Sequence, residues 1–349
     1  MAKEQCVTRG ARRVRIAVDA MGGDYAPQEI VKGAAMAGQR GNVEIVLVGP
    51  TNILEKELAN FASANLPIRC VEAADIVKEG EPPAWAVYRR PNCSVAVATR
   101  LVKSGEADAL LSAGSSGATA VSAVQYLGMI AGMERPAIGS TLGRFAPNIV
   151  MMDLGANVDC KPHHLLSFGI AGSVFAKKFL NISDPTIGLL STGAEEGKGS
   201  ELVREGYPLL KNSGLKFIGN VEGSDILSGK ANVIVCDGFV GNVLLKFYES
   251  VGDHALEWIK QKFKKYPPLG SMAGLLFGRL FPLTKMSYEG EEEGSGILWG
   301  VDGVVIVAHG ACQAPDIVHA IASARKAVDV DIVGSLRSEL EKLGKAGKA

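Results

Sequence analysis

Short apolar runs recur along the chain, and most of them end in a glycine-rich turn that carries polar side chains. Runs of this kind, rich in Val, Ile and Leu, are typical of strands that are buried on both faces of a sheet. The predicted strands are Val14–Val18, Val43–Val48, Ala109–Ser112, Ile149–Met152, Ile187–Leu190, Val233–Val235 and Val304–Val307.

Helix-like segments separate most of these runs. They are Pro27–Ala37, Asn52–Ala62, Ser94–Lys103, Ala118–Ile130, Glu201–Lys211, Asn242–Lys262 and Pro315–Val328. Strands that alternate with helices indicate an α/β fold, here a doubly wound, mostly parallel sheet flanked by helices. We expect a single domain over residues 14–335, followed by a lysine-rich tail at 336–349 that frays.

One segment, residues 250–290, departs from this alternation and predicts a protruding amphipathic helical segment. Between Trp258 and Lys285 the chain contains several basic residues and no Asp or Glu. An apolar band lies within it, at Leu269, Met272, Leu276, Phe277, Leu280 and Phe281. Such a band beside positive charge fits either a membrane interface or contact with a second subunit, and ordinary packing on its own domain is equally open.

Composition narrows the function classes. Lys plus Arg and Asp plus Glu both total 37, so no overall field attracts nucleic acid. The six cysteines are widely spaced without a C-x-x-C pair, which argues against a zinc site or a disulfide framework and favours a reducing cytoplasm. We expect no signal peptide and no membrane span, because the first residues are polar and basic and no apolar stretch approaches about 20 residues.

The turn Ser112–Gly117 follows a predicted strand and opens a predicted helix. Its N–H groups and the hydroxyls of Ser115 and Ser116, between Gly114 and Gly117, are able to hold a phosphate at the positive end of that helix. A serine-capped turn without a ligand explains the same residues. The pattern matches neither a dinucleotide fingerprint nor a nucleophile elbow, and the absence of the fingerprint weakens the interpretation as a dehydrogenase.

A second turn, Thr192–Ser200, differs at two positions from a nucleotide P-loop, so ATP binding is not supported. Lys198 lies between two glycines, where an ammonium group suits a phosphate or an oxyanion. The alternative is a solvated surface lysine.

Three further residues follow predicted strands. Asn242 is either a helix N-cap or an amide donor to a carbonyl oxygen, and Asp237 either holds a cationic partner or completes a turn. His309 is the best candidate for an acid or base among the five histidines, although a lone histidine is more often structural. His163 and His164 lack metal-ligand spacing, and we interpret them as surface or packing residues.

Several separated motifs together resemble the phosphate acyltransferases of the PlsX type. They are DAMGGD at Asp19–Asp24, RPAI at Arg135–Ile138, DLGAN at Asp153–Asn157, GNVEG at Gly219–Gly223, CDGFVGNV at Cys236–Val243 and HG at His309–Gly310. The order of the motifs makes the resemblance specific, and it extends from about Arg15 to Val328. The chain has Ser115 and Ser116 where this family is expected to have an Asn-Thr pair.

The resemblance implies transfer of a fatty acyl group from acyl-acyl carrier protein to inorganic phosphate, giving an acyl phosphate for phospholipid synthesis, without a metal or cofactor. It also implies a cytoplasmic homodimer at the inner face of the cell membrane that supplies a membrane acyltransferase. Carrier proteins are acidic, so a basic docking patch is expected, with Arg89, Arg90 and the lysines at 260–265 as candidates.

Phosphate is a competent nucleophile near neutral pH, so the reaction needs no covalent serine or cysteine. We expect Lys198 and the Gly114–Gly117 turn to hold phosphate and Asn242 to donate to the thioester oxygen. Asp237 is expected to orient Lys198 or the turn, and His309 to move a proton or bind phosphate. Further substrate-binding candidates are Asp19, Gly22, Gly23, Asp24 and Asn157.

Two other functions remain open at this point. A phosphate acetyl- or butyryltransferase that uses acyl-coenzyme A needs similar chemistry, and donor preference separates it. A non-catalytic protein that binds acyl chains or forms a scaffold predicts ligand binding without turnover.

Overall fold

The computed structural model describes residues 12–61, 66–78, 80–142, 146, 148–265 and 295–346. The strands are β1 (Val14–Asp19), β2 (Val43–Gly49), β3 (Ile68–Glu72), β4 (Ala109–Ser112), β5 (Ala137–Thr141), β6 (Val150–Met152), β7 (Ile187–Leu190), β8 (Phe217–Val221), β9 (Val233–Val235), β10 (Ser295–Trp299) and β11 (Val304–Ala308). The α-helices are α1 (Gln28–Gln39), α2 (Thr51–Leu58), α3 (Pro83–Arg89), α4 (Ser94–Lys103), α5 (Ser116–Tyr126), α6 (Pro162–Phe179), α7 (Glu201–Lys211), α8 (Gly238–Lys265), α10 (Ala314–Asp329) and α11 (Ile332–Ala346), with a 3-10 helix, η2, at Gly223–Ser228.

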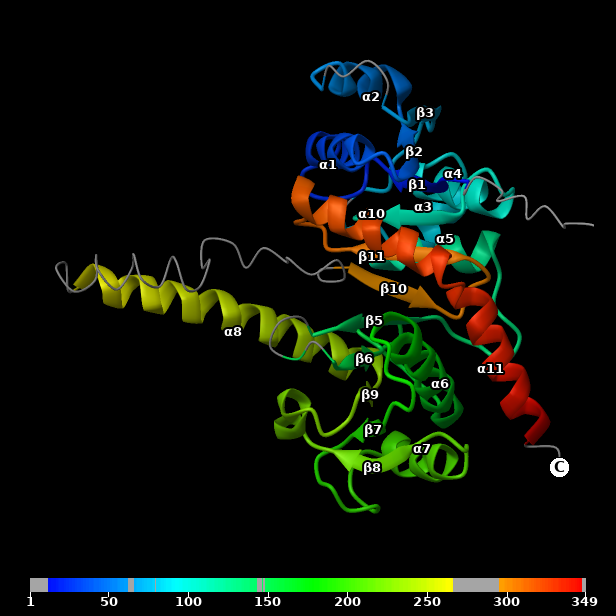
Figure 1. Cartoon of the computed structure of the whole chain (residues 1–349), viewed down its shortest axis with the longest axis vertical. Helices are drawn as coiled ribbons and strands as arrows, with labels where there is room; N and C mark the ends of the chain where they lie inside the picture. Colours follow the sequence, from blue (N-terminus) through cyan, green and yellow to red (C-terminus); the bar gives the residue numbers. More distant parts are fainter. Residues whose placement is uncertain are drawn as a thin grey trace, which may run out of the picture.

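The strands form one twisted sheet in the order β3-β2-β1-β4-β11-β10-β5-β6-β9-β7-β8. Most neighbours are parallel, but β10 is antiparallel to both β11 and β5, and β5 is antiparallel to β6. Because of these three antiparallel pairings, β6, β9, β7 and β8 run in the opposite direction to β1, β4 and β11. The twist is visible in Figure 1, where β10 lies close to the plane of the page while β2 is seen nearly end-on.

Helices cover both faces of the sheet, as the alternation of strands and helices predicts. Side chains alternate along each strand, so that Ile16 and Val18 join one buried cluster and Ala17 joins the other. The first cluster includes residues of α1, α6, α10 and α11, and the second includes residues of α4 and α5. Figure 1 shows this arrangement around β1 and β2, with α1 on one side of the strands and α4 on the other. The doubly wound, mostly parallel sheet is therefore confirmed.

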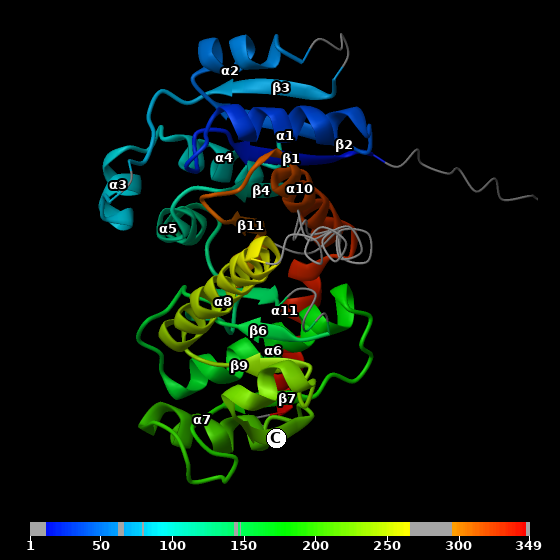
Figure 2. The ribbon, with the colours of Figure 1, turned by 90° about the vertical axis from the view of Figure 1, so that its left-hand side faces the viewer.

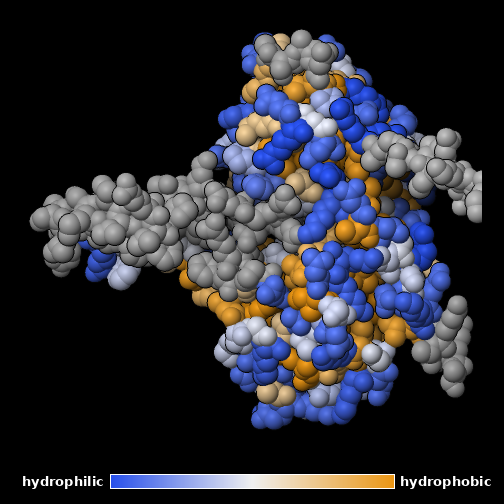
Figure 3. Space-filling model, in the orientation of Figure 1, coloured by the Kyte–Doolittle hydropathy of each residue, from blue (hydrophilic) through white to orange (hydrophobic). Residues whose placement is uncertain are grey.

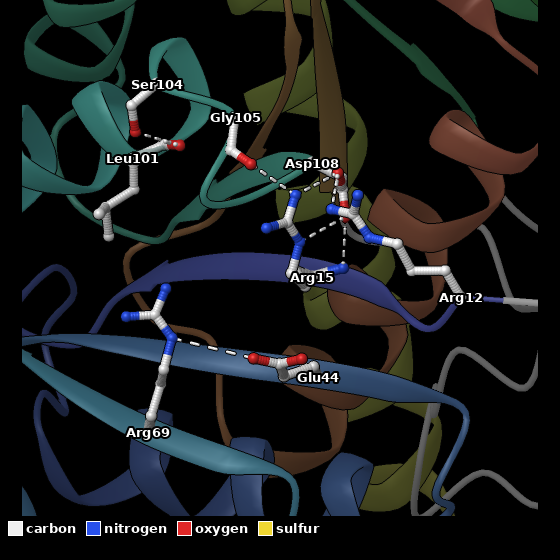
Figure 4. Close-up of polar contacts among 8 residues, drawn as sticks. All are labelled: Arg12, Arg15, Glu44, Arg69, Leu101, Ser104, Gly105 and Asp108. Atoms are coloured by element: carbon white, nitrogen blue, oxygen red, sulfur yellow. Dashed lines mark hydrogen bonds and ion pairs between the residues drawn. The ribbon is translucent and has the colours of Figure 1, made fainter.

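An ionic cluster fixes the amino ends of β1 and β4 (Figure 4). The Arg15 backbone N–H and side chain donate to both carboxylate oxygens of Asp108, at 2.8 to 3.2 Å, and the guanidinium also donates to the Gly105 carbonyl. Arg12 adds a further contact to Asp108, and Arg69 of β3 pairs with Glu44 of β2. These contacts fix the relative position of the strands whose carboxyl ends carry the glycine-rich turns.

Two sequence-based expectations are wrong. The tail from Leu336 was expected to fray, but it continues α11, and Leu336 and Leu340 are buried against the body of the protein. Burial of the apolar side chains on one side of α11 stabilises the helix despite its lysine content. α8 begins at Gly238 rather than at Asn242. The predicted apolar band at Leu269, Met272, Leu276, Phe277, Leu280 and Phe281 lies outside the described residues.

Candidate active site

The structure divides the candidate residues into two groups, each at the carboxyl ends of three adjacent strands. The β1–β4–β11 cluster contains Asp19, Gly22, Gly23, Asp24, the Gly114–Gly117 turn and His309. The β6–β9–β7 cluster contains Asp153, Asn157, Lys198, Asp237 and Asn242. No hydrogen bond joins the two clusters in the part of the chain that the structure describes. We expected all of them to act in one reaction site, because the sequence does not indicate the antiparallel pairings of β10 and β5.

In the β1–β4–β11 cluster, the buried carboxylate of Asp19 holds two turns together. Its Oδ2 accepts a hydrogen bond from the Ser112 hydroxyl at 2.8 Å, and its Oδ1 accepts one from the Met21 N–H at 3.3 Å. Ser112 Oγ in turn accepts the Gly114 N–H at 3.1 Å. Burial raises the pKa of Asp19, against the opposing effect of hydrogen bonds from Ser94 and Ser112. Asp19 therefore positions these turns and does not itself face a phosphate.

Glycines allow these two turns to approach each other. A Cβ at Gly22 would lie 2.6 Å from Asp19 Oδ2 and 2.7 Å from the Gly114 nitrogen. Gly23 has a φ of +114°, a conformation that favours glycine. The N–H of Asp24 donates to the Gly310 carbonyl at 2.8 Å, which attaches the β1 turn to the β11 turn.

The hydroxyl of Ser115 has a structural role in this cluster. Ser115 is the N-cap of α5, and its Oγ accepts the Ala118 N–H at 3.4 Å. Ser116 and Gly117 are exposed at the start of the helix, where N–H groups without helical acceptors point outward. The phosphate-binding potential of this turn therefore lies in its backbone more than in Ser115.

His309 is exposed, and a local hydrogen bond determines its tautomer. The Ala311 N–H donates to Nδ1 at 3.1 Å, so the neutral ring carries its proton on Nε2. In this form His309 offers a hydrogen-bond donor to solvent or to a substrate oxygen. It does not offer a free base at Nε2.

In the β6–β9–β7 cluster, Asp153 and Asn157 form a rigid turn after β6. Asp153 is fully buried, and its carboxylate accepts hydrogen bonds from the N–H groups of Ile138, Gly155, Ala156 and Asn157 and from the Asn157 amide. Burial raises the pKa of Asp153, against these hydrogen bonds. Asn157 Nδ2 also donates to the Pro136 carbonyl at 2.6 Å, so both amide protons are used within the protein. Asn157 was a substrate-binding candidate, and we reassign it to holding this turn.

The start of α8 packs directly on this turn. A Cβ at Gly241 would lie 1.9 Å from the Asp153 carbonyl oxygen, and one at Gly238 would lie 2.6 Å from the Asn157 carbonyl oxygen. Only glycine permits this approach, and the spacing of the two glycines in CDGFVGN is the sequence signal for it. The contact fixes the next residue, Asn242, whose side chain lies against Gly155.

The structure distinguishes between the two roles predicted for Asn242, a helix N-cap and an amide donor. Asp237 is the residue before α8, and its Oδ1 accepts the Val240 N–H at 2.9 Å, as an N-cap does. Asn242 therefore lies within the first turns of α8 and does not cap it. Its amide has no hydrogen-bond partner in the described part of the chain and remains available as a donor.

Lys198 lies on the turn after β7, at the same edge as Asn242. Asn220 Nδ2 supports this turn by donating to the Glu195 carbonyl at 2.8 Å, and the Ser200 hydroxyl caps α7 immediately beyond it. Lys198 is exposed, and no described residue forms an ion pair with its ammonium group. The side chain is therefore free to bind an anion.

The thiols beside this cluster are poor nucleophiles. Burial raises the pKa of Cys160 to about 12 and that of Cys236 well above its ordinary value. Since a thiolate is the reactive form, both groups are inert at neutral pH. This agrees with an acyl transfer that does not pass through a cysteine.

One group among the described residues has the spacing of metal ligands. His163 Nε2 and His164 Nε2 lie 3.0 and 3.4 Å from Glu134 Oε2. However, His164 Nδ1 accepts the Lys161 N–H at 3.0 Å, so its proton lies on Nε2, the atom that faces Glu134. A ligand histidine needs the opposite tautomer. We interpret the group as a link between Glu134 and the start of α6.

Comparison with known proteins identifies the family. The profile described as "Fatty acid synthesis protein" matches residues 14–334. The chain belongs to this family. A phosphate acyltransferase from Thermosynechococcus vestitus is 43% identical over 91% of this chain and 92% of its own length. A phosphate acyltransferase from Pelotomaculum thermopropionicum is 42% identical over 95% and 96%. The chain is thus an enzyme that transfers acyl groups to phosphate.

Solved structures share the fold at low sequence identity. A phosphotransacetylase from Streptococcus pyogenes superposes with a TM-score of 0.59 at 17% identity, over 92% of this chain and 95% of that one. A branched-chain phosphotransacylase from Enterococcus faecalis gives 0.56 at 15% identity, over 90% and 99%. A 4-hydroxythreonine-4-phosphate dehydrogenase from Klebsiella pneumoniae gives 0.51 at 14%, over 91% and 98%. No described helix is long and apolar enough to cross a membrane.

Proposed function

We propose that this phosphate acyltransferase takes a fatty acyl group from acyl-acyl carrier protein and transfers it to inorganic phosphate. The observation that supports the site assignment is a pair of polar side chains, Lys198 and Asn242, that lie at one edge of the sheet and have no partner among the residues that the structure describes. The family match to fatty acid synthesis supports an acyl donor of this class.

In the proposed reaction, a phosphate oxygen attacks the thioester carbonyl carbon. A C–O bond forms, the carbonyl oxygen becomes an oxyanion, and collapse of the tetrahedral species breaks the C–S bond and releases the carrier thiolate. Lys198 offsets the charge of the bound phosphate. The Asn242 amide donates to the oxyanion, and a well-placed donor of this kind contributes about 2.7–4 kcal/mol. We further propose that the β1–β4–β11 cluster faces the same phosphate, with backbone N–H groups of the Gly114–Gly117 turn and His309 Nε2–H as additional donors.

The roles of the two aspartates at this site differ. Asp237 caps α8 and thereby directs the helix that carries Asn242. No ion pair between Asp237 and Lys198 is present among the described residues, so the expectation that Asp237 orients Lys198 directly is replaced by this indirect role.

The test is phosphate-dependent release of free carrier protein from a long-chain acyl-acyl carrier protein, with hydroxylamine trapping of the acyl phosphate. Acyl-coenzyme A serves as the parallel donor. Turnover that requires phosphate and prefers the carrier protein supports the proposal. Activity confined to short acyl-coenzyme A would replace it by the phosphotransacetylase reaction, which the fold similarity also accommodates. Binding without turnover would indicate a non-catalytic role.

We also propose that the enzyme is a homodimer that associates with the inner face of the cell membrane, where a membrane acyltransferase uses its product. α8 projects from the body in Figure 1, and hydrophobic surface appears in Figure 3 where the helix leaves it. Four large apolar side chains, spaced four residues apart, form an exposed stripe on α8: Phe239, Val243, Phe247 and Val251. A second copy would cover such a stripe.

The membrane part of this proposal rests on the apolar band beyond α8. Vesicle co-sedimentation of Leu276→Glu plus Phe277→Glu tests it. Lost binding with an unchanged dimer supports membrane contact, whereas unchanged binding with a dissociated dimer assigns the band to the subunit interface.

A further inference from the structure

An exposed aromatic surface on α3 has no role in the chemistry described above. Trp85 is 51% exposed and Tyr88 is 77% exposed, and Arg89 beside them is exposed as well. We call these three residues the α3 surface. Trp, Tyr and Arg are the residue types that contribute most often to the centres of protein interfaces, because they bury a large area with few rotatable bonds.

The α3 surface is held in a defined conformation before any partner binds. Ala86 and Val87, on the opposite side of the helix, are buried. Arg90 pairs with Glu81 and donates to the Ile76 carbonyl, and both Arg89 and Arg90 lie over the Trp85 ring, 5.8 and 6.0 Å from its centre. A surface that is already ordered loses less conformational entropy on binding.

The α3 surface adjoins the candidate phosphate-binding turn. The first residue of α3, Pro83, packs on Gly117, where an added Cβ would lie 2.8 Å from Pro83 Cγ. Figure 2 shows α3 at the margin of the molecule, beside α5, the helix that begins with this turn. A macromolecule seated on α3 would therefore deliver an attached group to the region where phosphate is proposed to bind.

Charge indicates what kind of partner fits. Residues 76–100 contain four cationic side chains and two acidic ones, within a chain whose overall net charge is zero. A second copy of the chain fits poorly, because a two-fold symmetric contact would bring Arg89 toward the Arg89 of its partner. An acidic surface is complementary in sign.

We propose that the α3 surface docks the acidic face of the carrier protein that brings the acyl thioester. This inference rests on the proposed function, since it requires a protein-bound donor. Tyr88 and Trp85 supply the contact area, and Arg89 supplies the opposite charge.

Steady-state kinetics with two donors of equal chain length test the proposal. The variant is Arg89→Glu, and the matched control is Arg40→Glu, an exposed arginine that precedes β2 at the amino edge of the sheet. We expect Arg89→Glu to raise KM for acyl-acyl carrier protein about tenfold, which corresponds to about 1.4 kcal/mol. In the same variant, we expect the KM for phosphate and the turnover of acyl-coenzyme A to stay within about twofold of the wild-type values. Arg40→Glu should leave all values unchanged.

Calorimetric titration of the carrier protein into Arg89→Glu and Tyr88→Ala gives a second readout that does not depend on turnover. About tenfold weaker binding, with an unaltered melting curve, agrees with docking at α3. Unchanged KM and unchanged binding would overturn it, and so would equal losses with both donors or a change in oligomeric state. A wild-type enzyme that ignores the carrier protein and uses only acyl-coenzyme A would instead overturn the proposed function itself.

Discussion

Asp19 and Asp153 are buried aspartates in comparable places, one ending β1 and the other following β6, yet they are held in different ways. Asp153 accepts hydrogen bonds from four backbone N–H groups and one amide, all of which can only donate. Asp19 is bound partly by the Ser112 hydroxyl, which can donate or accept after a rotation.

The same difference extends to the clusters around the two aspartates. In the β6–β9–β7 cluster the carboxylate of Asp153 is fully hydrogen-bonded within the protein. Among the described residues, the side chains of Lys198 and Asn242 form no hydrogen bond or ion pair, and the buried Ser191 Oγ and Asn220 Oδ1 also lack a partner. In the β1–β4–β11 cluster the polar side chains mainly hold the turns, and the free donors are backbone N–H groups and His309. Rigid support beside unpaired donors is the arrangement that stabilises a transition state without reorganisation. We therefore assign the main chemistry to the β6–β9–β7 cluster.

The largest expected effect is that of Asn242→Ala. Loss of one oxyanion donor lowers kcat by about 100- to 1,000-fold with little change in KM for phosphate. The measurement is phosphate-dependent turnover of the acyl donor by the folded variant. Turnover near the wild-type rate would show that the amide does not contact the reacting carbonyl.

Asp153→Asn should destabilise the protein by about 3 kcal/mol, because the new NH2 group faces N–H donors and leaves them unpaired. Urea unfolding followed by circular dichroism measures the change in free energy of unfolding. Asp184→Asn is the matched control, since Asp184 makes an exposed ion pair with Lys216, and it should change stability by less than about 0.5 kcal/mol. Equal effects would remove the distinction between a buried and an exposed aspartate.

Asp19→Asn should cost less than Asp153→Asn, because the hydroxyl partner can reverse its role. Its effect also depends on pH. Burial raises the folded-state pKa of Asp19 above the ordinary value of 3.8, so the folded protein holds this proton more tightly than the unfolded chain. Wild-type stability therefore falls as pH rises through the window above 3.8, and the neutral variant lacks this loss.

Unfolding curves of wild type and Asp19→Asn at about pH 4 and about pH 7 check this sign. The variant should gain stability relative to wild type at the higher pH. A relative loss at the higher pH would mean that the ionised Asp19 is stabilised in the folded protein, as a carboxylate with a lowered pKa would be.

The smallest expected effect is that of Ser115→Ala. Removal of the N-cap hydroxyl should lower the free energy of unfolding by about 1 kcal/mol. Turnover should stay within about twofold of wild type, because the proposed phosphate contacts of this turn are backbone groups. A large rise in KM for phosphate would assign the hydroxyl to the substrate.

Much of the fold could be predicted from the sequence because its central strands are apolar on both faces. The ranges predicted for β4, β7 and β9 agree with the structure at both ends. Four strands were missed, and each has a weaker pattern. β3 and β8 are the partly exposed edges, β5 carries Gly139 and Ser140, and β10 begins with Ser295 and Gly296. α6 was missed because it is buried on nearly all sides and lacks the polar stripe of an amphipathic helix.

The candidate site was predicted only in part. The sequence identified Lys198, Asn242 and His309 as polar residues after strands, which the structure bears out. Strand direction depends on long-range pairing, so the reversal at β10 and β5 that divides these residues between two clusters left no local pattern. Asp153 could be found only as part of its motif, because its function depends on N–H groups whose directions are set by the folded turn.

The most direct test of the central claim compares Lys198→Ala with His309→Ala in phosphate-dependent acyl transfer, with melting curves to confirm folding. A charged donor contributes about twice as much as a neutral one. We expect a loss of at least about 100-fold in kcat/KM for phosphate in Lys198→Ala and a loss below about tenfold in His309→Ala. A His309→Ala loss equal to or greater than that of Lys198→Ala would contradict the assignment of the main chemistry to the β6–β9–β7 cluster.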